Sequence, residues 1–325
     1  MIAGLLVSVL RIIYLFIDGI GLGQNNPDTN PFRRYASSYL SAPGGISPTV
    51  SVPDAWRMAE TDASLGFPGL PQSASGQTTL WTGTNGVRAM GRHKTGFPGP
   101  TLIRVLEQFS VIKTLKDRGR PATLLNAYTD EYMARIGAHP RLMSASTVLQ
   151  RVSGQPLKSM RDLERGDALY MDVTHEIMHQ LYPQLRETFP IRSARERGRD
   201  LVRMSRSYDL TIYEFFLTDK AGHDQDFELA RWAITTLEEF LAGICETLDP
   251  ADELLLVTSD HGNLEDMSTK THTHNPVPTF VFGAESRSIA GRIRSLLDIV
   301  PIIYEQLGLQ VELPGPEENP DSRAE

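Results

Sequence analysis

The chain alternates short apolar runs with longer stretches of helical periodicity, and this alternation limits its possible folds more than any other feature. The apolar runs are rich in β-branched and aromatic residues and end in a turn or a polar residue, as buried strands do. They span 12–17, 122–127, 210–217, 254–257 and 279–283. Apolar residues recur at three- and four-residue spacing over 100–118, 227–248 and 286–307. Alternating strands and helices predict an α/β fold with a mostly parallel central sheet covered by helices on both faces.

The stretch 128–199 breaks this alternation. It is rich in charged residues, has few strand-like runs and contains helical patterns such as 174–189. We interpret it as an inserted cap, which divides the main domain into 11–127 and 200–312. The Pro- and Glu-rich tail, 313–325, is expected to be disordered.

The N-terminal run MIAGLLVSVLRIIYLFI has the apolar character of a signal peptide or a membrane anchor. Three features favour a buried strand instead. Arg11 interrupts the run, no small-residue cleavage site follows it, and it leads straight into Asp18 and Gly19. We therefore expect no membrane partner and interpret 1–10 as an N-terminal extension.

The charge and cysteine content exclude several classes of function. Acidic side chains outnumber basic ones by 40 to 32, the formal charge is -8, and there is no long basic run, which argues against nucleic acid as the main partner. Cys245 is the only cysteine, so an intrachain disulfide and a thiolate-rich zinc site are excluded. A single cysteine fits a reducing, cytoplasmic setting.

Polar residues at the ends of the apolar runs mark the expected binding site, because open α/β sheets bind ligands at the carboxyl ends of their strands. Asp18 ends the first run, Asp219 follows the run 210–217, and the segment SDH follows the next strand at 259–261. His272 precedes the last strand. We expect these side chains to gather at one edge of the sheet.

Three short segments carry residues of the types that bind divalent metals. Asp219 and His223 in TDKAGH are four residues apart, which places a carboxylate and an imidazole on one side of a helical turn. SDHGN presents Asp260 and His261 together at a strand end, and THTHNPVP adds two histidines beside prolines that fix the backbone. Each segment alone is also typical of an ordinary polar loop. Together they supply enough ligands for two adjacent metal ions.

The segment PQSASGQTTLWTG opens a predicted helix over 74–82. A serine at a helix N-terminus lies where backbone N–H groups and the helix dipole favour an anionic phosphate. Such a serine is also a common N-cap residue. Ser73 and Ser75 are both candidates for either role.

In their order along the chain these motifs resemble those of the alkaline phosphatase superfamily, most closely its cofactor-independent phosphoglycerate mutase and phosphopentomutase branch. The resemblance covers both halves of the main domain but not the cap, and it implies a three-layer α/β sandwich. In that superfamily the nucleophile lies ten residues before the Gly of a Thr-Gly-like turn, so Gly83 selects Ser73 over Ser75. The H-T-x-N-P-V-P motif likewise selects His272 over His274.

The resemblance also implies two divalent metal ions, held by carboxylate and imidazole ligands that suit Zn²⁺ and Mn²⁺ better than Mg²⁺. The ligands of one ion would be Asp219, His223 and His272. The ligands of the other would be Asp18, Asp260, His261 and the Ser73 oxygen. Ser73 would then attack phosphorus in line and form a phosphoserine intermediate.

The chain departs from the mutases in length and around the nucleophile. Those mutases carry a large inserted domain, whereas the insertion here is short. Their Ser-Glu-x-Gly-His run reads Ser-Ala-Ser-Gly-Gln at 73–77. We therefore expect a substrate other than phosphoglycerate. Sulfatases share the fold, but Ser73 lacks the Pro and Arg of their C/S-x-P-x-R motif.

Substrate contacts are expected from the cap and from a basic group that follows the predicted helix 74–82. This basic group would bind a second anionic group of the substrate. The basic group comprises Arg88, Arg92, His93 and Lys94, for which a solvated loop is the alternative; Asn126, at the end of a predicted strand, is a further candidate. The leading hypothesis is a metal-dependent phosphohydrolase that acts on a small phosphoester. The alternatives are an intramolecular phosphomutase and a non-catalytic protein that binds metal or a phospho-ligand.

Overall fold

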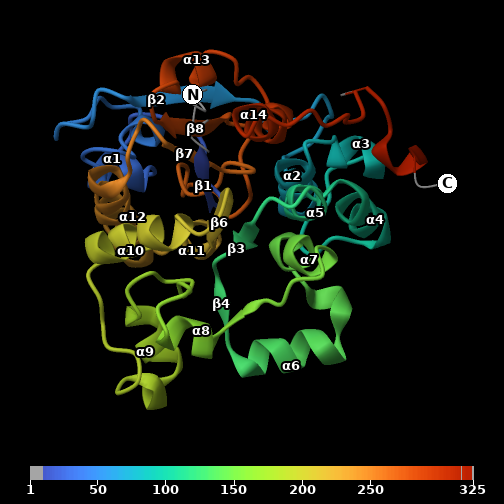
Figure 1. Cartoon of the computed structure of the whole chain (residues 1–325). Coiled ribbons are helices and arrows are strands. Elements are labelled where there is room, and N and C mark those ends of the chain that lie inside the picture. Colours follow the sequence, from blue (N-terminus) through green and yellow to red (C-terminus); the bar gives the residue numbers. More distant parts are fainter. Residues whose placement is uncertain (1–9, 316, 324–325) are drawn as a thin grey trace, which may run out of the picture.

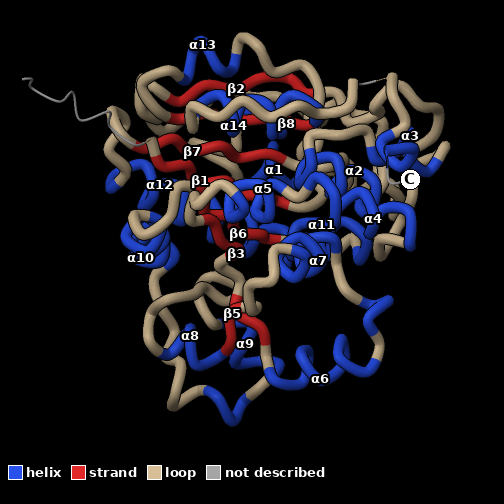
Figure 2. Tube along the Cα trace, turned by 45° about the vertical axis from the view of Figure 1, so that its right-hand side comes forward, coloured by secondary structure: helices blue, strands red, loops and turns tan. Residues whose placement is uncertain are grey.

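The computed structural model of the protein describes residues 10–315 and 317–323 (Figure 1). Its centre is a six-stranded sheet in the order β2-β8-β7-β1-β6-β3, which Figure 2 shows as a stack of strands. The strands are β1 (Arg11–Ile17), β2 (Trp56–Thr61), β3 (Ala122–Leu124), β6 (Leu210–Phe215), β7 (Glu253–Thr258) and β8 (Val277–Phe282).

Most of the sheet is parallel. Strand β1 pairs in parallel with β6 and β7, and β3 pairs in parallel with β6. Strand β8 runs antiparallel to both β7 and β2, so one edge of the sheet is mixed. The predicted α/β fold with a mostly parallel central sheet is therefore confirmed.

Helices cover both faces of the sheet (Figure 1). One face carries α1 (Pro31–Tyr35), α10 (Ala194–Ser205), α11 (Leu217–Asp224) and α12 (Phe227–Thr247). The other face carries α2 (Ser73–Thr82), α3 (Gly86–Met90), α4 (Pro100–Phe109), α5 (Val111–Asp117), α7 (Ala145–Val152), α13 (Ser286–Ala290) and α14 (Ile299–Gln306). These three layers are those of the predicted sandwich.

Alternate side chains of β1 enter two apolar cores, because successive residues of a strand point to opposite faces. Tyr14 and Phe16 enter the core under α2, where Trp81 meets both rings edge-on at centroid distances of 5.5 and 5.2 Å. Leu15 and Ile17 enter the core under α12. All of these side chains are almost completely buried, and each contributes roughly 1.5–3 kcal/mol of transfer free energy. Both layers are thereby fixed to the strand that ends at Asp18.

The cap forms a separate lobe below the sheet in Figures 1 and 2. Its elements are the paired short strands β4 (Ala127–Tyr128) and β5 (Lys158–Ser159) and the helices α6 (Asp130–Ala138), α8 (Met160–Glu164) and α9 (Glu176–Leu181). A small apolar cluster of its own, with Leu163, Tyr170, Met178 and Phe189, holds the lobe together. Helix α7 falls within the predicted cap limits and α10 begins within them, but both pack partly or wholly on the main domain. The limits 128–199 stay a prediction.

Several predicted elements differ in length from those in the structure. The helix expected over 100–118 is interrupted at Ser110, whose hydroxyl accepts a hydrogen bond from Lys113 N and caps α5. The helix expected over 286–307 breaks into α13, the 3₁₀ turn η4 (Leu296–Asp298) and α14, because Ser295 and Asp298 form a capping box. Over 174–189, α9 is followed by the short 3₁₀ turn η3 (Pro183–Leu185).

Strand β2 was not predicted. It lies at the edge of the sheet, where only some of its side chains are buried, so it lacks the continuous apolar run of an inner strand. The sequence around it therefore gave no strand signal of the kind that identified β1, β6 and β7.

The C-terminal segment differs from the expected disordered tail. A 3₁₀ turn, η5 (Pro320–Arg323), contacts α3 and α4, and Asp321 accepts two hydrogen bonds from Arg104. Composition alone does not reveal a charged partner on a distant helix. The predicted N-terminal extension lies outside the described residues, except for its last position. Of the helices in the described ranges, none has the length and apolar character needed to cross a membrane.

Candidate metal centre

The carboxyl ends of three neighbouring strands bring most of the predicted ligands together. Asp18 directly follows β1, and Asp260 and His261 follow β7. Strand β6 leads into α11, which carries Asp219 and, one turn later, His223. Because β6, β1 and β7 are adjacent and parallel, these ends share one edge of the sheet.

The first group of ligands comprises Asp219, His223 and His272. His223 Nε2 lies 3.4 Å from Asp219 Oδ2, and His272 Nε2 lies 3.7 Å from Asp219 Oδ1. The two imidazole Nε2 atoms are 3.2 Å apart. One carboxylate and two imidazoles thus converge from α11 and from the loop before β8.

The second group comprises Asp18, Asp260, His261 and Ser73. His261 Nε2 lies 3.3 Å from Asp18 Oδ1, 3.5 Å from Asp260 Oδ2 and 3.0 Å from the Ser73 hydroxyl oxygen. Asp260 and His261 are completely buried. This group contains the predicted nucleophile and the three other ligands assigned to the second ion.

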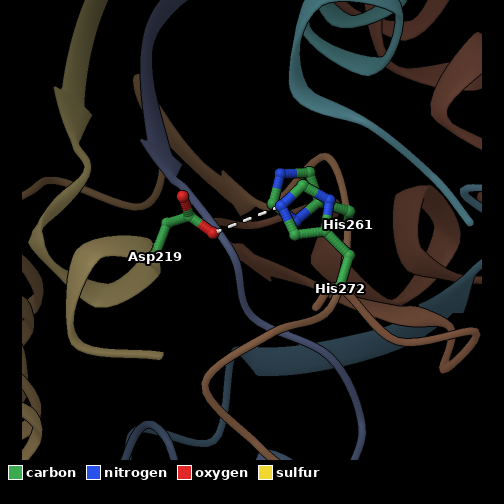
Figure 3. Close-up of side chains that lie close together, drawn as sticks. All are labelled: Asp219, His261 and His272. Atoms are coloured by element: carbon green, nitrogen blue, oxygen red, sulfur yellow. Dashed lines mark ion pairs between the residues drawn. The ribbon is translucent and has the colours of Figure 1, made fainter. Parts of the chain in front are cut away.

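His261 joins the two groups. Its ligand atom lies within 4.8 Å of those of Asp219 and His272, and also within 4.8 Å of those of Asp18 and Asp260. Figure 3 shows the imidazoles of His261 and His272 stacked, with the Asp219 carboxylate pointing toward them; the ring centroids are 3.6 Å apart. The structure therefore brings all seven predicted side chains into one continuous cluster.

Backbone carbonyls fix the orientation of His223 and His272. The Nδ1 atoms of His223 and His272 lie 2.8 and 2.9 Å from the carbonyl oxygens of Lys270 and Pro71. A carbonyl oxygen only accepts hydrogen bonds, so each Nδ1 carries a proton and Nε2 is the atom left to bind a cation. The two Nε2 atoms lie 3.2 Å apart. This is the arrangement of imidazoles that share a cation.

The buried carboxylates also fit a cation. Asp18 Oδ1 and both carboxylate oxygens of Asp260 are buried and have no hydrogen-bond partner among the described residues. Burial first, and then the charges of neighbouring carboxylates, raise the pKa of both groups well above the usual range. Burial lowers the pKa of His261 to about 3 and also lowers the pKa of His272, so both rings are neutral, as metal ligands must be.

Asp219 and His223 form a different kind of pair, because His223 is partly exposed. The hydrogen bond with Asp219 raises the pKa of His223 to about 9. Burial would raise the pKa of Asp219, but the hydrogen bond with His223 and the neighbouring imidazole outweigh burial and lower that pKa to about 2. A metal ion at this position has to displace the proton that the pair holds.

Glu265 is a buried residue that the sequence reasoning missed. Its Oε2 accepts hydrogen bonds from the backbone N–H groups of Gly21 and Asn263, both at 2.8 Å. Its Oε1 accepts from the Thr273 hydroxyl and from the Asn275 amide. One carboxylate thereby ties together the loop after β1, the loop with Asp260 and His261, and the loop with His272. Its position soon after SDHGN was the only sequence signal.

The nucleophile helix packs closely on the ligand loops. Ser73 is the first residue of α2, and Gln77, one turn later, donates a hydrogen bond to Asp18 Oδ2 at 3.2 Å. Gly76 lies against Asp260, where an added Cβ atom would stand 3.0 Å from the Asp260 backbone oxygen. A larger residue at position 76 would push the helix, and Ser73 with it, away from Asp260.

A cavity of about 530 Å³ opens beside Ser73 and extends between the strand ends and the cap. Asn126 is part of its wall, but its amide is bound to the backbone of Glu214 through two hydrogen bonds of 2.8 and 2.9 Å. Asn126 thus stabilises the wall of the cavity, and its contact with substrate stays a prediction. Glu214 also lines the cavity, and burial raises its pKa to about 7.

The predicted basic group does not line this cavity. Arg88 forms an ion pair with Glu317 and lies over the ring of Phe67, and the His93 ring contacts the Phe67 carbonyl. The Lys94 ammonium donates to a neighbouring backbone carbonyl, and Arg92 is exposed. Their role in substrate binding stays a prediction without a contact to support it.

Comparisons with known proteins agree with this geometry. Residues 187–311 match the Metalloenzyme superfamily. Over 126 residues the chain is 33% identical to the 2,3-bisphosphoglycerate-independent phosphoglycerate mutase of Desulforudis audaxviator, a stretch that covers 37% of this chain and 25% of the mutase. The chain therefore spans about a quarter of the length of such a mutase.

Two solved structures share the fold. PH0037 from Pyrococcus horikoshii matches with a TM-score of 0.55 and 14% identity, over 95% of this chain and 100% of that chain. Thermus thermophilus alkaline phosphatase matches with a TM-score of 0.54 and 11% identity, over 98% of this chain and 96% of that chain. Residues 187–311 thus match the Metalloenzyme superfamily, and the chain as a whole has the fold of an alkaline phosphatase.

Proposed function

We propose that the protein is a phosphohydrolase that uses two divalent metal ions and cleaves a small phosphomonoester with Ser73 as the nucleophile. One observation carries the proposal. The Ser73 hydroxyl lies 3.0 Å from His261 Nε2, and His261 belongs to both ligand groups. A nucleophilic hydroxyl at the junction of two metal sites suits in-line attack on phosphorus.

Each of the two proposed metal ions has its own set of ligands. Asp219, His223 and His272 would hold one ion, and Asp18, Asp260, His261 and Ser73 would hold the other. Bound divalent ions supply charge neutralisation and lower the pKa of a coordinated hydroxyl. Zn²⁺ and Mn²⁺ fit this mixture of carboxylates and imidazoles better than Mg²⁺ does.

Ser73 is placed for attack by the helix that it starts. As the first residue of α2 it lies beside backbone N–H groups that have no partner within the helix, and these groups favour a phosphate or a developing alkoxide. The close packing of Gly76 on Asp260 keeps this helix end at the ligands. Ser73 would carry the phosphoryl group in a phosphoserine intermediate, which water then hydrolyses.

A phosphomutase is the second candidate, because the D. audaxviator relative is a phosphoglycerate mutase. The chain has Gln77 where the mutase motif has His. This difference favours transfer of the phosphoryl group to water. A non-catalytic protein that binds metal or a phospho-ligand is the third candidate.

The test uses phosphate release from an aryl phosphate by protein loaded with Mn²⁺ or Zn²⁺. The Ser73→Ala variant should lose at least about a thousandfold in kcat, as expected for a nucleophile. Ser75→Ala is the matched control, since the hydrogen bonds of the Ser75 hydroxyl within the described part of the chain are to the Gln72 carbonyl and the Lys94 N–H; it should stay within about tenfold of the native rate.

Three results would contradict the proposal. Isomerisation of a sugar phosphate without free phosphate would favour the mutase. A folded, metal-loaded protein that is inert toward a broad panel of phosphoesters would exclude the hydrolase. Ligand binding without turnover, together with a silent Ser73→Ala change, would support a binding protein.

A further inference from the structure

The wall of the cavity beside Ser73 is rich in aromatic side chains. The cap contributes Tyr128, Tyr132, Tyr170 and Tyr182, and the main domain contributes Phe97 and Phe216. Phe97 and Phe216 are 44% and 36% exposed, which is unusual for large apolar side chains. Tyr170 is buried, but the two exposed rings next to a reactive hydroxyl indicate a surface that a ligand covers.

Two of these rings are held rigidly. Tyr128 on β4 and Tyr132 on α6 stack with a centroid distance of 4.8 Å and an interplanar angle of 21°. The Tyr132 hydroxyl is 2.7 Å from the hydroxyl of Thr147, at the start of α7. Because α7 packs on the main domain, this contact couples the cap rings to the part of the molecule that carries Ser73. The stacked pair is therefore a pre-formed part of the aromatic wall.

The charges on the wall do not favour a second anionic group. Apart from the proposed metal ligands, the lining residues include two acids, Glu131 and Glu214, and two bases, Arg135 and Lys220. The Lys220 ammonium is 2.6 Å from an Asp224 carboxylate oxygen, and the Arg135 guanidinium lies 5.1 Å from the centroid of the Tyr132 ring. The acidic and basic side chains of the cavity wall are therefore equal in number, and the rest of the wall includes aromatic rings.

We propose that this aromatic wall binds the leaving group, and that the substrates are phosphomonoesters of alcohols that carry a flat aromatic or heteroaromatic ring. This inference rests on the proposed function of Ser73. The cavity volume of about 530 Å³ lies within the usual range for sites that enclose drug-sized ligands. A ring alcohol fills such a space far better than a three-carbon acid does.

The proposed reaction has two steps. The bond between Ser73 Oγ and phosphorus forms as the bond between phosphorus and the ester oxygen breaks, and the ring alcohol leaves with the serine proton. Water then attacks phosphorus, the bond to Ser73 Oγ breaks, and Ser73 regains a proton from the water. The products are the ring alcohol and inorganic phosphate.

The experiment compares 2-phenylethyl, 2-cyclohexylethyl and ethyl phosphate with 3-phosphoglycerate, using the metal-loaded full chain. The three alkyl esters have primary alcohols of similar reactivity, so differences in kcat/KM report binding of the leaving group. The phenyl ester should exceed each of the others by at least about tenfold. Tyr128→Leu and Tyr132→Leu should lower the ratio of phenyl to ethyl ester at least about tenfold. Tyr132→Phe, which keeps the ring, should retain the ratio.

A control and a second measurement separate this inference from the proposed function. Ile191→Ala removes an exposed apolar side chain that is not part of the cavity wall and should leave the ratio unchanged. Calorimetry on the metal-loaded Ser73→Ala variant compares 2-phenylethylphosphonate with ethylphosphonate and needs no turnover. The phenyl compound should bind at least about tenfold more tightly.

Each outcome has a distinct meaning. Equal kcat/KM for the phenyl and ethyl esters overturns the aromatic subsite and leaves the phosphohydrolase in place. A preference that survives both tyrosine-to-leucine changes also overturns it. No turnover of any ester, together with tighter binding of the phenyl phosphonate, overturns the phosphohydrolase and supports the subsite. Equal binding of the two phosphonates overturns the subsite whatever the turnover.

Discussion

The edge of the sheet and the cap wall meet at one cavity, but they are built in opposite ways. At the sheet edge, Asp18, Asp219 and Asp260 follow three adjacent strands, so the fold itself brings them together. The cap wall takes its rings from separate short elements, including β4 and α6, that do not belong to the central sheet. The first region depends on strand pairing and charge, and the second depends on how small helices pack.

The largest effect on the sheet edge is expected from the residue that both ligand groups share. His261→Ala should lose both metal ions and at least about a thousandfold in kcat/KM, because His261 is a proposed ligand of one ion and its ring, stacked on His272, also orders the ligands of the other. His272→Ala should lose mainly one ion. The measurement is metal content per chain after dialysis, together with the rate of phosphate release.

His274→Ala is the matched control for these two variants. It is an exposed histidine two positions after His272 and does not belong to either ligand group. Its metal content should equal that of the native chain. Loss of both ions from His272→Ala and retention of one by His261→Ala would reverse the assignment of the shared ligand.

A smaller effect is expected at Glu265, which contacts three ligand loops but no ligand atom. In Glu265→Gln an amide NH₂ has to face N–H or O–H donors, so the loops lose two of their four hydrogen bonds. Metal affinity should fall by about 10–100-fold, as for other residues that orient ligands. The measurement is a competitive titration with a chelator, and Asp266→Asn serves as the neighbouring acidic control.

The Glu265→Gln variant also tests whether the sheet edge and the cap wall act independently. The preference for phenyl over ethyl ester in fully metal-loaded Glu265→Gln should equal that of the native protein, because the cap rings do not contact Glu265. A changed preference with native metal affinity would show that Glu265 acts on the cap rather than on the ligand loops.

The pH dependence of metal binding should follow His223. In the metal-free protein the pKa of His223 is raised to about 9, so the pair with Asp219 contributes stability that is fully present below the unfolded value of about 6.5 and is lost as the pH rises through 9. A metal ion has to displace that proton below pH 9. Apparent affinity should therefore rise by about ninefold from pH 7 to pH 8 and level off above pH 9.

Calorimetry in two buffers with different ionisation enthalpies measures the protons released on metal binding. At least one proton per chain should be released at pH 7. Equal affinities at pH 7 and pH 9, without proton release, would show that His223 is not a ligand.

The smallest effect on the metal centre is expected from a change inside the cap. Met178 is completely buried in the separate apolar cluster of the cap, and Met178→Ala should cost about 2–5 kcal/mol of packing free energy there. Metal content should stay native while the preference for the phenyl ester falls. Loss of metal from this variant would show that the two regions are not independent.

The contrast between the sheet edge and the cap wall explains which features were predictable from the sequence and which were not. The inner strands were found because β1, β6 and β7 are continuous apolar runs, and the residues after them were chosen as ligands because strand ends converge. The edge strand β2 was missed because only part of it is buried. The break at Ser110 was missed because the apolar spacing continues through a residue that caps a new helix.

Residues that act through tertiary contacts gave no usable signal. Glu265 is recognised only when its four donors are seen to come from separate loops. The stacking of Tyr128 and Tyr132 depends on how α6 lies beside β4, which periodicity does not determine. The basic residues 88–94 were chosen for charge alone, and the fold places them away from the cavity wall.

The most direct test of the two-metal centre is anomalous diffraction from crystals of the native chain soaked in Mn²⁺ or Zn²⁺. Two peaks are expected, one among Asp219, His223 and His272, and one beside Ser73 among Asp18, Asp260 and His261. A cluster without bound metal, or metal bound only elsewhere on the chain, would contradict the account.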